Sequence, residues 1–225
     1  MVDLSAQTIV ALLTRAPSAG GKTRLFQELD RACDPDLLLA LLLDTLEAAT
    51  ITGLPVVVFC EPPEACDGLR AQLPPGVRVE PQAVGDLGAR MGAAFDALMA
   101  EGAGRVLLIG SDLPTLSPDL LREADAAIST GAADVVLGPS MDGGYALIGA
   151  RQTPWPLFRD ITWSRPDVLE RTLNAATRVG LRAAVLPATQ DVDTLADLRA
   201  VCSGEGAART RASSGMLPRP GTVTG

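Results

Sequence analysis

Short apolar runs with β-strand character alternate with helical patterns along most of this 225-residue chain. Runs such as Val106–Ile109 are apolar at every position, which is typical of strands buried on both faces of a parallel sheet. The helical segments carry start signals: Ser117 is an N-cap residue, and Pro118 and Asp119 suit the first turn. The alternation predicts an α/β protein with three layers, helix–sheet–helix, and a mostly parallel sheet. We predict strands at Thr8–Thr14, Pro55–Cys60, Val77–Glu80, Arg105–Gly110, Asp134–Gly138, Tyr145–Gly149 and Arg182–Leu186, and helices at Asp34–Thr50, Glu64–Gln72, Asp86–Ala100, Pro118–Ser129, Pro166–Val179 and Thr194–Val201.

The chain length allows one large domain or two small ones. No interior stretch has the composition of a linker, and no internal repeat is visible, so we expect one domain over residues 5–202. From Ser203 to Gly225 the sequence consists mainly of Gly, Ser, Thr, Pro and Arg without periodicity. This composition predicts a disordered C-terminal tail, residues 203–225.

The composition excludes several classes of chemistry. The chain has no histidine, which removes Ser–His and Cys–His nucleophile systems, an imidazole base and every zinc site that needs a histidine ligand. A net charge of −8 argues against nucleic acid as a partner. The four cysteines form no C-x-x-C pair, and neither a signal peptide nor a membrane span is recognisable. We therefore expect a cytoplasmic protein with reduced thiols.

The loop after the first predicted strand, Arg15–Leu25, is rich in small residues and carries Lys22 and Arg24. Small residues let backbone N–H groups approach an anion, and the two cations suit phosphate. The loop nearly fits the P-loop pattern, with Ala16 in place of the first glycine. A plain glycine-rich turn with solvated basic residues is the simpler alternative.

Carboxylates follow three further strands. Asp112 follows the fourth strand, Asp142 the fifth, and Asp191 and Asp193 the last. Asp112 alone also suits a turn, and Asp142-Gly143-Gly144 alone also suits a hairpin turn. Ligands of a parallel sheet lie at the carboxyl ends of its strands. Together, these loops predict a Mg²⁺ site next to substrate phosphates.

The same segments resemble a bacterial family with the glycosyltransferase-A, or nucleotide-diphospho-sugar transferase, fold, whose members are commonly labelled glycosyltransferases. The resemblance covers about residues 8–202, and 2-phospho-lactate guanylyltransferases are similar in part. It rests on Gly21-Lys22-Thr23-Arg24-Leu25, Gly85-Asp86-Leu87-Gly88-Ala89-Arg90, Gly110-Ser111-Asp112-Leu113-Pro114, Asp142-Gly143-Gly144-Tyr145, Thr162-Trp163-Ser164 and Asp191-Val192-Asp193-Thr194.

This resemblance implies a role for each segment. Asp112 and Asp193 would bind Mg²⁺ or Mn²⁺, with Asp191 as the alternative to Asp193. Lys22 and Arg24 would neutralise nucleotide phosphates, and Asp142 would take part in catalysis. Helix capping by Asp86 and core packing of Trp163 are the structural alternatives. The expected nucleotide-binding residues are Arg15, Pro17, Gly20, Gly21, Asp86, Gly88, Arg90 and Ser111, and the second substrate would meet Gly143, Gly144, Tyr145, Trp163 and Ser164.

Three functions are compatible with this pattern. The first is a nucleotidyltransferase that joins a nucleoside triphosphate to a small phosphorylated acceptor and releases pyrophosphate, which needs no base. The second is a glycosyltransferase with a nucleotide-sugar donor, for which Asp142 is the candidate base. The third is a non-catalytic nucleotide-binding protein. The sequence offers no heptad or surface stripe that argues for an oligomer.

Overall fold

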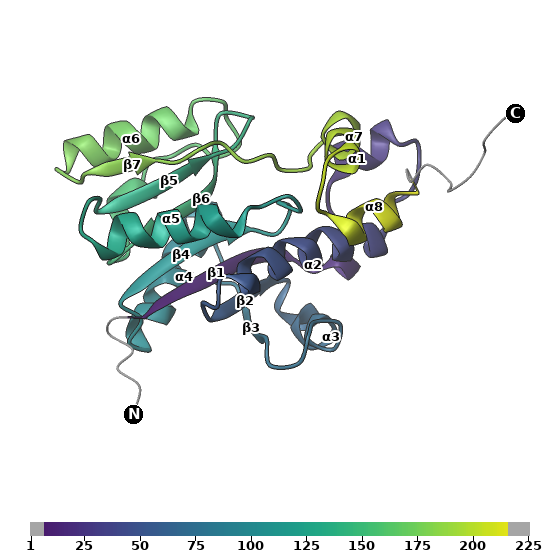
Figure 1. The fold of residues 1–225 in the computed structure, drawn as a ribbon, viewed down its shortest axis with the longest axis horizontal. Coiled ribbons are helices and arrows are strands. Elements are labelled where there is room, and N and C mark those ends of the chain that lie inside the picture. The colour runs from purple at the N-terminus through teal and green to yellow at the C-terminus, as the bar shows by residue number, and fades with distance from the viewer. Residues whose placement is uncertain (1–6, 216–225) are drawn as a thin grey trace, which may run out of the picture.

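A computed structural model describes residues 7–215, and its centre is one seven-stranded sheet with strand order β3-β2-β1-β4-β6-β5-β7 (Figure 1). Within the described residues, β6 is the only strand that runs antiparallel to its neighbours. The predicted α/β class with a mostly parallel sheet is therefore confirmed. The strands are β1 (Thr8–Arg15), β2 (Val56–Glu61), β3 (Arg78–Pro81), β4 (Arg105–Gly110), β5 (Val135–Pro139), β6 (Tyr145–Ala150) and β7 (Ala183–Val185).

Helices cover both faces of the sheet because its central strands are apolar on both sides. In β1, Val10 and Leu12 pack into one core, whereas Ala11 and Leu13 pack into the other. The first core includes residues of α2 (Pro35–Ile51), α3 (Cys66–Arg70) and α5 (Pro118–Ser129). The second includes residues of α4 (Leu87–Ala100) and α6 (Val168–Arg178).

A third, smaller core lies beyond the carboxyl ends of the strands. It joins α1 (Thr23–Glu28), the first turns of α2, and α7 (Leu195–Ser203), and α8 (Ala208–Ser214) lies alongside them (Figure 1). Its buried members include Leu25, Phe26, Leu37, Val192 and Leu198. This core fixes the segments before α1 and α7, both of which carry candidate site residues.

The prediction of a disordered tail from Ser203 is wrong for the residues up to Gly215. α7 extends to Ser203, and α8 packs against α2. The buried carboxylate of Asp44 on α2 accepts hydrogen bonds from the backbone amides of Arg209 and Thr210, at 3.3 and 2.8 Å. This long-range capping leaves no trace in local periodicity. Residues 5–6 of the predicted domain and 216–225 of the predicted tail lie outside the described residues.

None of the helices that the structure describes is both long enough and apolar enough to span a bilayer.

Candidate functional site

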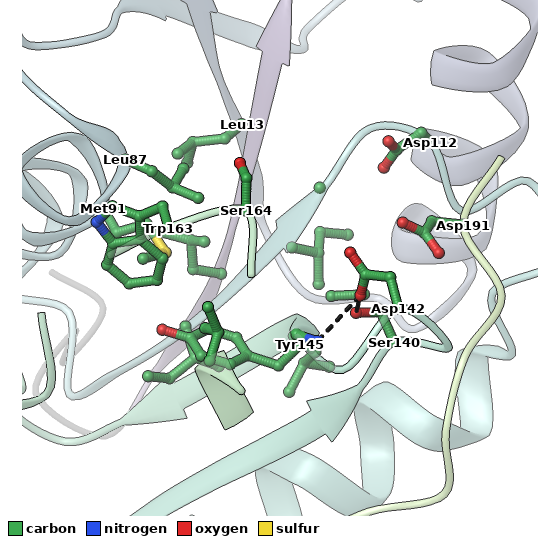
Figure 2. A pocket seen from close by; sticks show the side chains of 18 of the residues that line it. Leu13, Leu87, Met91, Asp112, Ser140, Asp142, Tyr145, Trp163, Ser164 and Asp191 are labelled. Carbon is green, nitrogen blue, oxygen red and sulfur yellow. Dashed lines mark hydrogen bonds between the residues drawn. The ribbon is translucent and has the colours of Figure 1, made fainter. Parts of the chain in front are cut away.

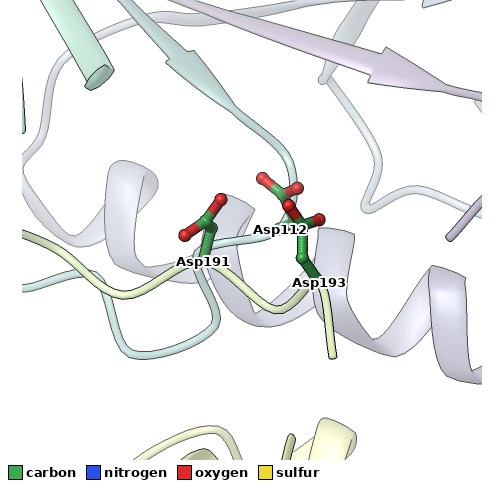
Figure 3. Close-up of side chains that lie close together, drawn as sticks. All are labelled: Asp112, Asp191 and Asp193. Atoms are coloured by element: carbon green, nitrogen blue, oxygen red, sulfur yellow. The ribbon is translucent and has the colours of Figure 1, made fainter. Parts of the chain in front are cut away.

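Three aspartates meet at the carboxyl edge of the sheet (Figure 3). Asp112 follows β4, and Asp191 and Asp193 lie on the segment between β7 and α7. One carboxylate oxygen from each lies within 4.8 Å of those of the other two. An all-oxygen donor set of this kind suits a hard divalent cation such as Mg²⁺ or Mn²⁺.

Backbone and side-chain hydrogen bonds hold these acidic segments in place. The amide of Val192, which is fully buried, donates to the carbonyl oxygen of Asp112 at 3.1 Å. The buried hydroxyl of Thr45 on α2 accepts from the amide of Leu113 at 3.0 Å and lies 3.2 Å from the carbonyl oxygen of Ser111. After Asp193, Thr194 and Asp197 form a capping box that starts α7.

The ammonium of Lys22 already lies between two of these carboxylates. Lys22 is the N-cap residue of α1, in the left-handed conformation with φ 48°, and forms ion pairs with both Asp112 and Asp193. Burial disfavours the charged ammonium, but the charges of Asp112 and Asp193 outweigh it and raise the pKa of Lys22 above its ordinary value. The lysine is therefore a cation held at the centre of the acidic cluster.

Asp191 is partly buried beside the other two carboxylates. Burial, together with the negative charges of Asp112 and Asp193, raises the pKa of Asp191 to about 6. A third carboxylate close to two others is easier to keep ionised when a cation is present. The sequence offered Asp191 as an alternative to Asp193, whereas the structure brings both to Asp112.

The glycine-rich loop after β1 borders a cavity of about 210 Å³ next to Asp112. Pro17 begins a 3₁₀ turn, and Gly20 and Gly21 follow it with φ values of 73° and 150°, which favour glycine. The helix that follows this loop, α1, has only six residues, which differs from the long helix expected after a P-loop. Of the predicted nucleotide-binding residues, Arg15, Gly20, Gly21 and Ser111 line this cavity, together with Lys22.

Arg24 lies elsewhere. Its side chain is 75% exposed, and its guanidinium pairs with Glu28 one turn along α1 at 3.2 Å. The structure thus places Arg24 on the outer surface of α1, away from the ion pairs of Lys22. Its catalytic role stays a prediction.

A second cavity of about 210 Å³ runs from the aspartates to an aromatic wall (Figure 2). Asp112 and Asp191 lie at one end, Asp142 in the middle, and Tyr145 and Trp163 at the other end. The two aromatic rings meet edge to face, with centroids 6.3 Å apart. The predicted residues Asp142, Gly144, Tyr145, Trp163 and Ser164 line this cavity, as do Leu13, Leu87, Met91 and Arg165.

The Asp142 loop is the turn of the β5–β6 hairpin and also a wall of the cavity. The Asp142 carboxylate accepts from the amide of Gly144 at 3.0 Å and from the hydroxyl of Ser140. Gly143 has φ 89°, and a Cβ there would lie 2.1 Å from the carbonyl oxygen of Pro166. Gly143 therefore contributes close backbone packing, which joins this loop to the segment that follows Trp163.

The Gly85–Arg90 segment has local structural roles. Asp86 caps α4 by accepting from the amide of Ala89 at 2.8 Å, and Arg90 pairs with Glu61. A Cβ on Gly88 would lie 2.8 Å from the ring of Trp163, which packs against α4 as the core-packing alternative predicted. The nucleotide-binding role of Asp86, Gly88 and Arg90 stays a prediction.

Sequence reasoning missed several residues of this site. Ser140 and Arg165 line the cavity and each lies next to a predicted motif in the sequence, but neither belongs to a recognisable motif itself. Leu13 and Met91 are ordinary apolar residues of a strand and a helix. Thr45 had one usable signal, since it is a hydroxyl on an otherwise apolar face of a predicted helix.

A sequence profile of a family described as "Uncharacterized protein conserved in bacteria (DUF2064)" matches residues 43–165, which include Asp112, Asp142 and Trp163. The chain belongs to this family. No curated protein matches the chain significantly.

Solved structures extend the comparison of this DUF2064 member to nearly the whole chain. A "putative nucleotide-diphospho-sugar transferase" from Desulfovibrio desulfuricans G20 is 27% identical, with a TM-score of 0.82 over 92% of this chain and 95% of that one. Rv0371c from Mycobacterium tuberculosis H37Rv, also solved with manganese, is 19% identical, with a TM-score of 0.58 over 88% and 99%. A CMP:2-keto-3-deoxy-manno-octonic acid synthetase bound to CTP is 14% identical, with a TM-score of 0.56 over 93% and 100%. These comparisons confirm the nucleotide-diphospho-sugar transferase fold that the sequence resembles, and the P-loop interpretation is wrong.

Proposed function

We propose that this DUF2064 member is a transferase that acts on a nucleotide with a divalent cation, and that its reaction is nucleotidyl transfer to a small phosphorylated acceptor. The observation that carries the proposal is the arrangement of Lys22 and three carboxylates beside the glycine-rich loop. One edge of the sheet thus carries cations and backbone amides that could bind phosphate, together with carboxylate oxygens that could bind a metal. The transferase fold and the CTP complex of a structural relative agree with this proposal.

In this proposal Asp112 and Asp193, with Asp191, hold the cation. A bound Mg²⁺ or Mn²⁺ would neutralise phosphate charge as the leaving group departs. Arg15 and Lys22 line the loop cavity and would face the nucleotide's phosphates. Gly20 and Gly21 leave their backbone accessible to phosphate oxygens, because neither carries a side chain.

The reaction then depends on position and charge. An oxygen of the acceptor's phosphate forms a bond to the α-phosphorus of the triphosphate, the bond from that phosphorus to the bridging oxygen breaks, and pyrophosphate leaves with that electron pair. The attacking oxygen is already anionic, so no proton has to be removed. This agrees with a chain that has no histidine.

One observation favours glycosyl transfer as a second candidate. Asp142 lies in the cavity between the acidic cluster and the aromatic wall, where a hydroxyl acceptor would need a base. Among the described residues that line this cavity, Arg165 is the only basic one, and it pairs with Asp167 at 3.2 Å. A neutral acceptor therefore fits this cavity at least as well as a phosphorylated one.

The experiment that separates the two is product analysis. The purified chain is incubated with Mg²⁺ or Mn²⁺ and each nucleoside triphosphate, together with a pool of sugar phosphates and other small organic phosphates. Release of pyrophosphate with a new nucleotide conjugate supports nucleotidyl transfer. A parallel incubation supplies nucleotide sugars and hydroxyl acceptors in place of these substrates. Release of nucleoside diphosphate in that incubation, without pyrophosphate release in the first, contradicts nucleotidyl transfer and supports the second candidate. Binding of nucleotides without either product would indicate a non-catalytic nucleotide-binding protein.

A further inference from the structure

Lys22 occupies the space that a cation bound by Asp112 and Asp193 would need. Its Nζ atom contacts an oxygen of each carboxylate, and its side chain is only 17% exposed. A divalent cation cannot take both oxygens while the ammonium stays there, because two cations would face each other at contact distance. Metal binding through these two oxygens therefore requires Lys22 to leave.

Moving Lys22 away from both carboxylates costs free energy unless another anion takes their place. A largely buried ammonium without an anion loses its hydration and gains nothing in return. The loop cavity that Lys22 also lines provides the nearest site for such an anion, since Arg15, Gly20 and Gly21 border it. The phosphates of a nucleotide bound in this cavity would supply that partner.

We propose that Lys22 is a built-in counter-ion that competes with the divalent cation for Asp112 and Asp193, so that metal and nucleotide bind cooperatively. The nucleotide half of this inference rests on the proposed function. The competition between lysine and metal rests on the ion pairs alone. In this scheme the nucleotide draws Lys22 to its phosphates and frees both carboxylates, and by linkage the metal raises nucleotide affinity by the same factor.

A lysine that merely positions the acidic loops makes the opposite prediction. In that case, loss of the ammonium lets three carboxylates repel one another and spread, so metal binding weakens. In the competition scheme, loss of the ammonium removes the competitor, so metal binding in the absence of nucleotide becomes tighter. The sign of the change therefore distinguishes the two roles.

The experiment measures Mn²⁺ binding by the full chain, using the electron paramagnetic resonance signal of free Mn²⁺ or calorimetry. Lys22→Met keeps the length of the side chain and removes its charge. Lys22→Asn is the second variant, because asparagine tolerates the left-handed conformation at this position and so guards against misfolding. Arg122→Met is the matched control, since it removes one positive charge from a half-exposed side chain on α5. Thermal melting confirms that each variant is folded.

We expect both Lys22 variants to bind Mn²⁺ about tenfold or more tightly than the wild type in the absence of nucleotide, because the apparent affinity falls with the fraction of binding-competent sites. Arg122→Met should match the wild type. Unchanged or weaker Mn²⁺ binding in folded Lys22 variants overturns the competition.

The nucleotide arm repeats the titration with saturating nucleoside di- or triphosphate. We expect the nucleotide to tighten Mn²⁺ binding to the wild type by about tenfold or more, and by much less in Lys22→Met. Nucleotide that binds without tightening Mn²⁺ binding overturns the coupling. If no nucleotide binds at all, the proposed function fails, and the metal titrations alone still decide the competition.

Discussion

The backbone amide of Val192 donates a hydrogen bond to the carbonyl oxygen of Asp112 at 3.1 Å. This contact joins the segment after β7 to the loop after β4, and the carboxylates on either side of Val192 lie close to that of Asp112. Val192 itself is fully buried in the small core with α1 and α7. The acidic cluster is thus built into the packing of the domain, and its members can be tested one at a time.

Asp112→Asn should weaken Mn²⁺ binding by at least about tenfold. Loss of a residue that only hydrogen-bonds to a metal ligand already lowers metal affinity by about 10- to 100-fold, and Asp112 is proposed as a ligand itself. The amide keeps the shape of the side chain but removes the charge. Mn²⁺ titration with nucleotide present measures the effect. Asp119→Asn, on an exposed side chain of α5, is the control. Equal binding by Asp112→Asn and the wild type would remove Asp112 from the metal site.

Asp142→Asn separates the two candidate reactions. Asparagine retains the oxygen that accepts from the amide of Gly144, so the loop should keep its conformation. If Asp142 is the base of a glycosyltransferase, the turnover number falls by about 10²- to 10⁴-fold. Nucleotidyl transfer, which needs no base, should fall by less than about tenfold. Turnover with the product-analysis substrates measures the change, and Ser140→Ala, which also changes the lining of the cavity, reports the effect of losing the second hydrogen bond to Asp142.

Gly88 and Gly92 form a matched pair on α4. A Cβ at Gly88 would lie 2.7 Å from the carbonyl oxygen of Phe158 and 2.8 Å from the ring of Trp163, and one at Gly92 would lie 2.3 Å from the ring of Trp155. Alanine at either position should lower the free energy of unfolding by about 1–3 kcal/mol through overpacking. Only Trp163 lines the cavity, so only Gly88→Ala should also change the affinity for the second substrate. Urea unfolding and ligand titration measure the two effects, and equal substrate affinity in both variants would contradict the assignment.

The glycine-rich loop and Asp112 could be predicted because each directly follows a buried apolar strand, β1 and β4. Asp191 and Asp193 lie further along the chain, after the short and partly exposed β7. The prediction that Asp112 and Asp193 lie at the same edge of the sheet required only that their strands be parallel, which the alternation of strands and helices indicates.

The orientation of Arg24 could not be predicted, since α1 is too short to show a periodic pattern. Its partner Glu28 lies one turn along the same helix. Tyr145 and Trp163 were expected to meet the second substrate through the family resemblance alone, and they line one cavity. No local pattern predicts that their segments come together.

Asp134 and Arg182 allow a test of electrostatics at the far end of the sheet. The side chain of Arg182 donates two hydrogen bonds to the carboxylate, at 2.8 and 3.0 Å, and holds the pKa of Asp134 near 2, below the ordinary value of 3.8. A depressed folded-state pKa means that the pair stabilises the fold above pH 3.8 and loses this contribution as the pH falls toward 2. Carboxyl ¹³C titration should show the midpoint near 2 in the wild type and a higher one in Arg182→Gln. An identical midpoint in the variant would contradict the role of Arg182.

Substitution of Asp44 tests what holds α8, the last described helix, against α2. The Asp44 carboxylate is buried on α2 and accepts from the amides of Arg209 and Thr210 and from the Arg209 guanidinium, the last at 3.1 Å. Removing the acceptor leaves the buried amide of Thr210 without this partner, which costs about 1–3 kcal/mol. We therefore expect Asp44→Ala to lower the free energy of unfolding by that amount and to speed amide exchange throughout α8.

Glu47→Ala is the matched control. Glu47 contacts the same guanidinium from the same helix, at 2.5 Å, but its side chain is 53% exposed, so its loss should cost less than about 1 kcal/mol. If both variants exchange α8 amides equally fast, the helix is held by surface charge and the buried cap is not its anchor. If only Asp44→Ala releases α8, one buried carboxylate on α2 keeps the C-terminal helix folded, because a polar tail without periodicity has little apolar surface of its own to bury.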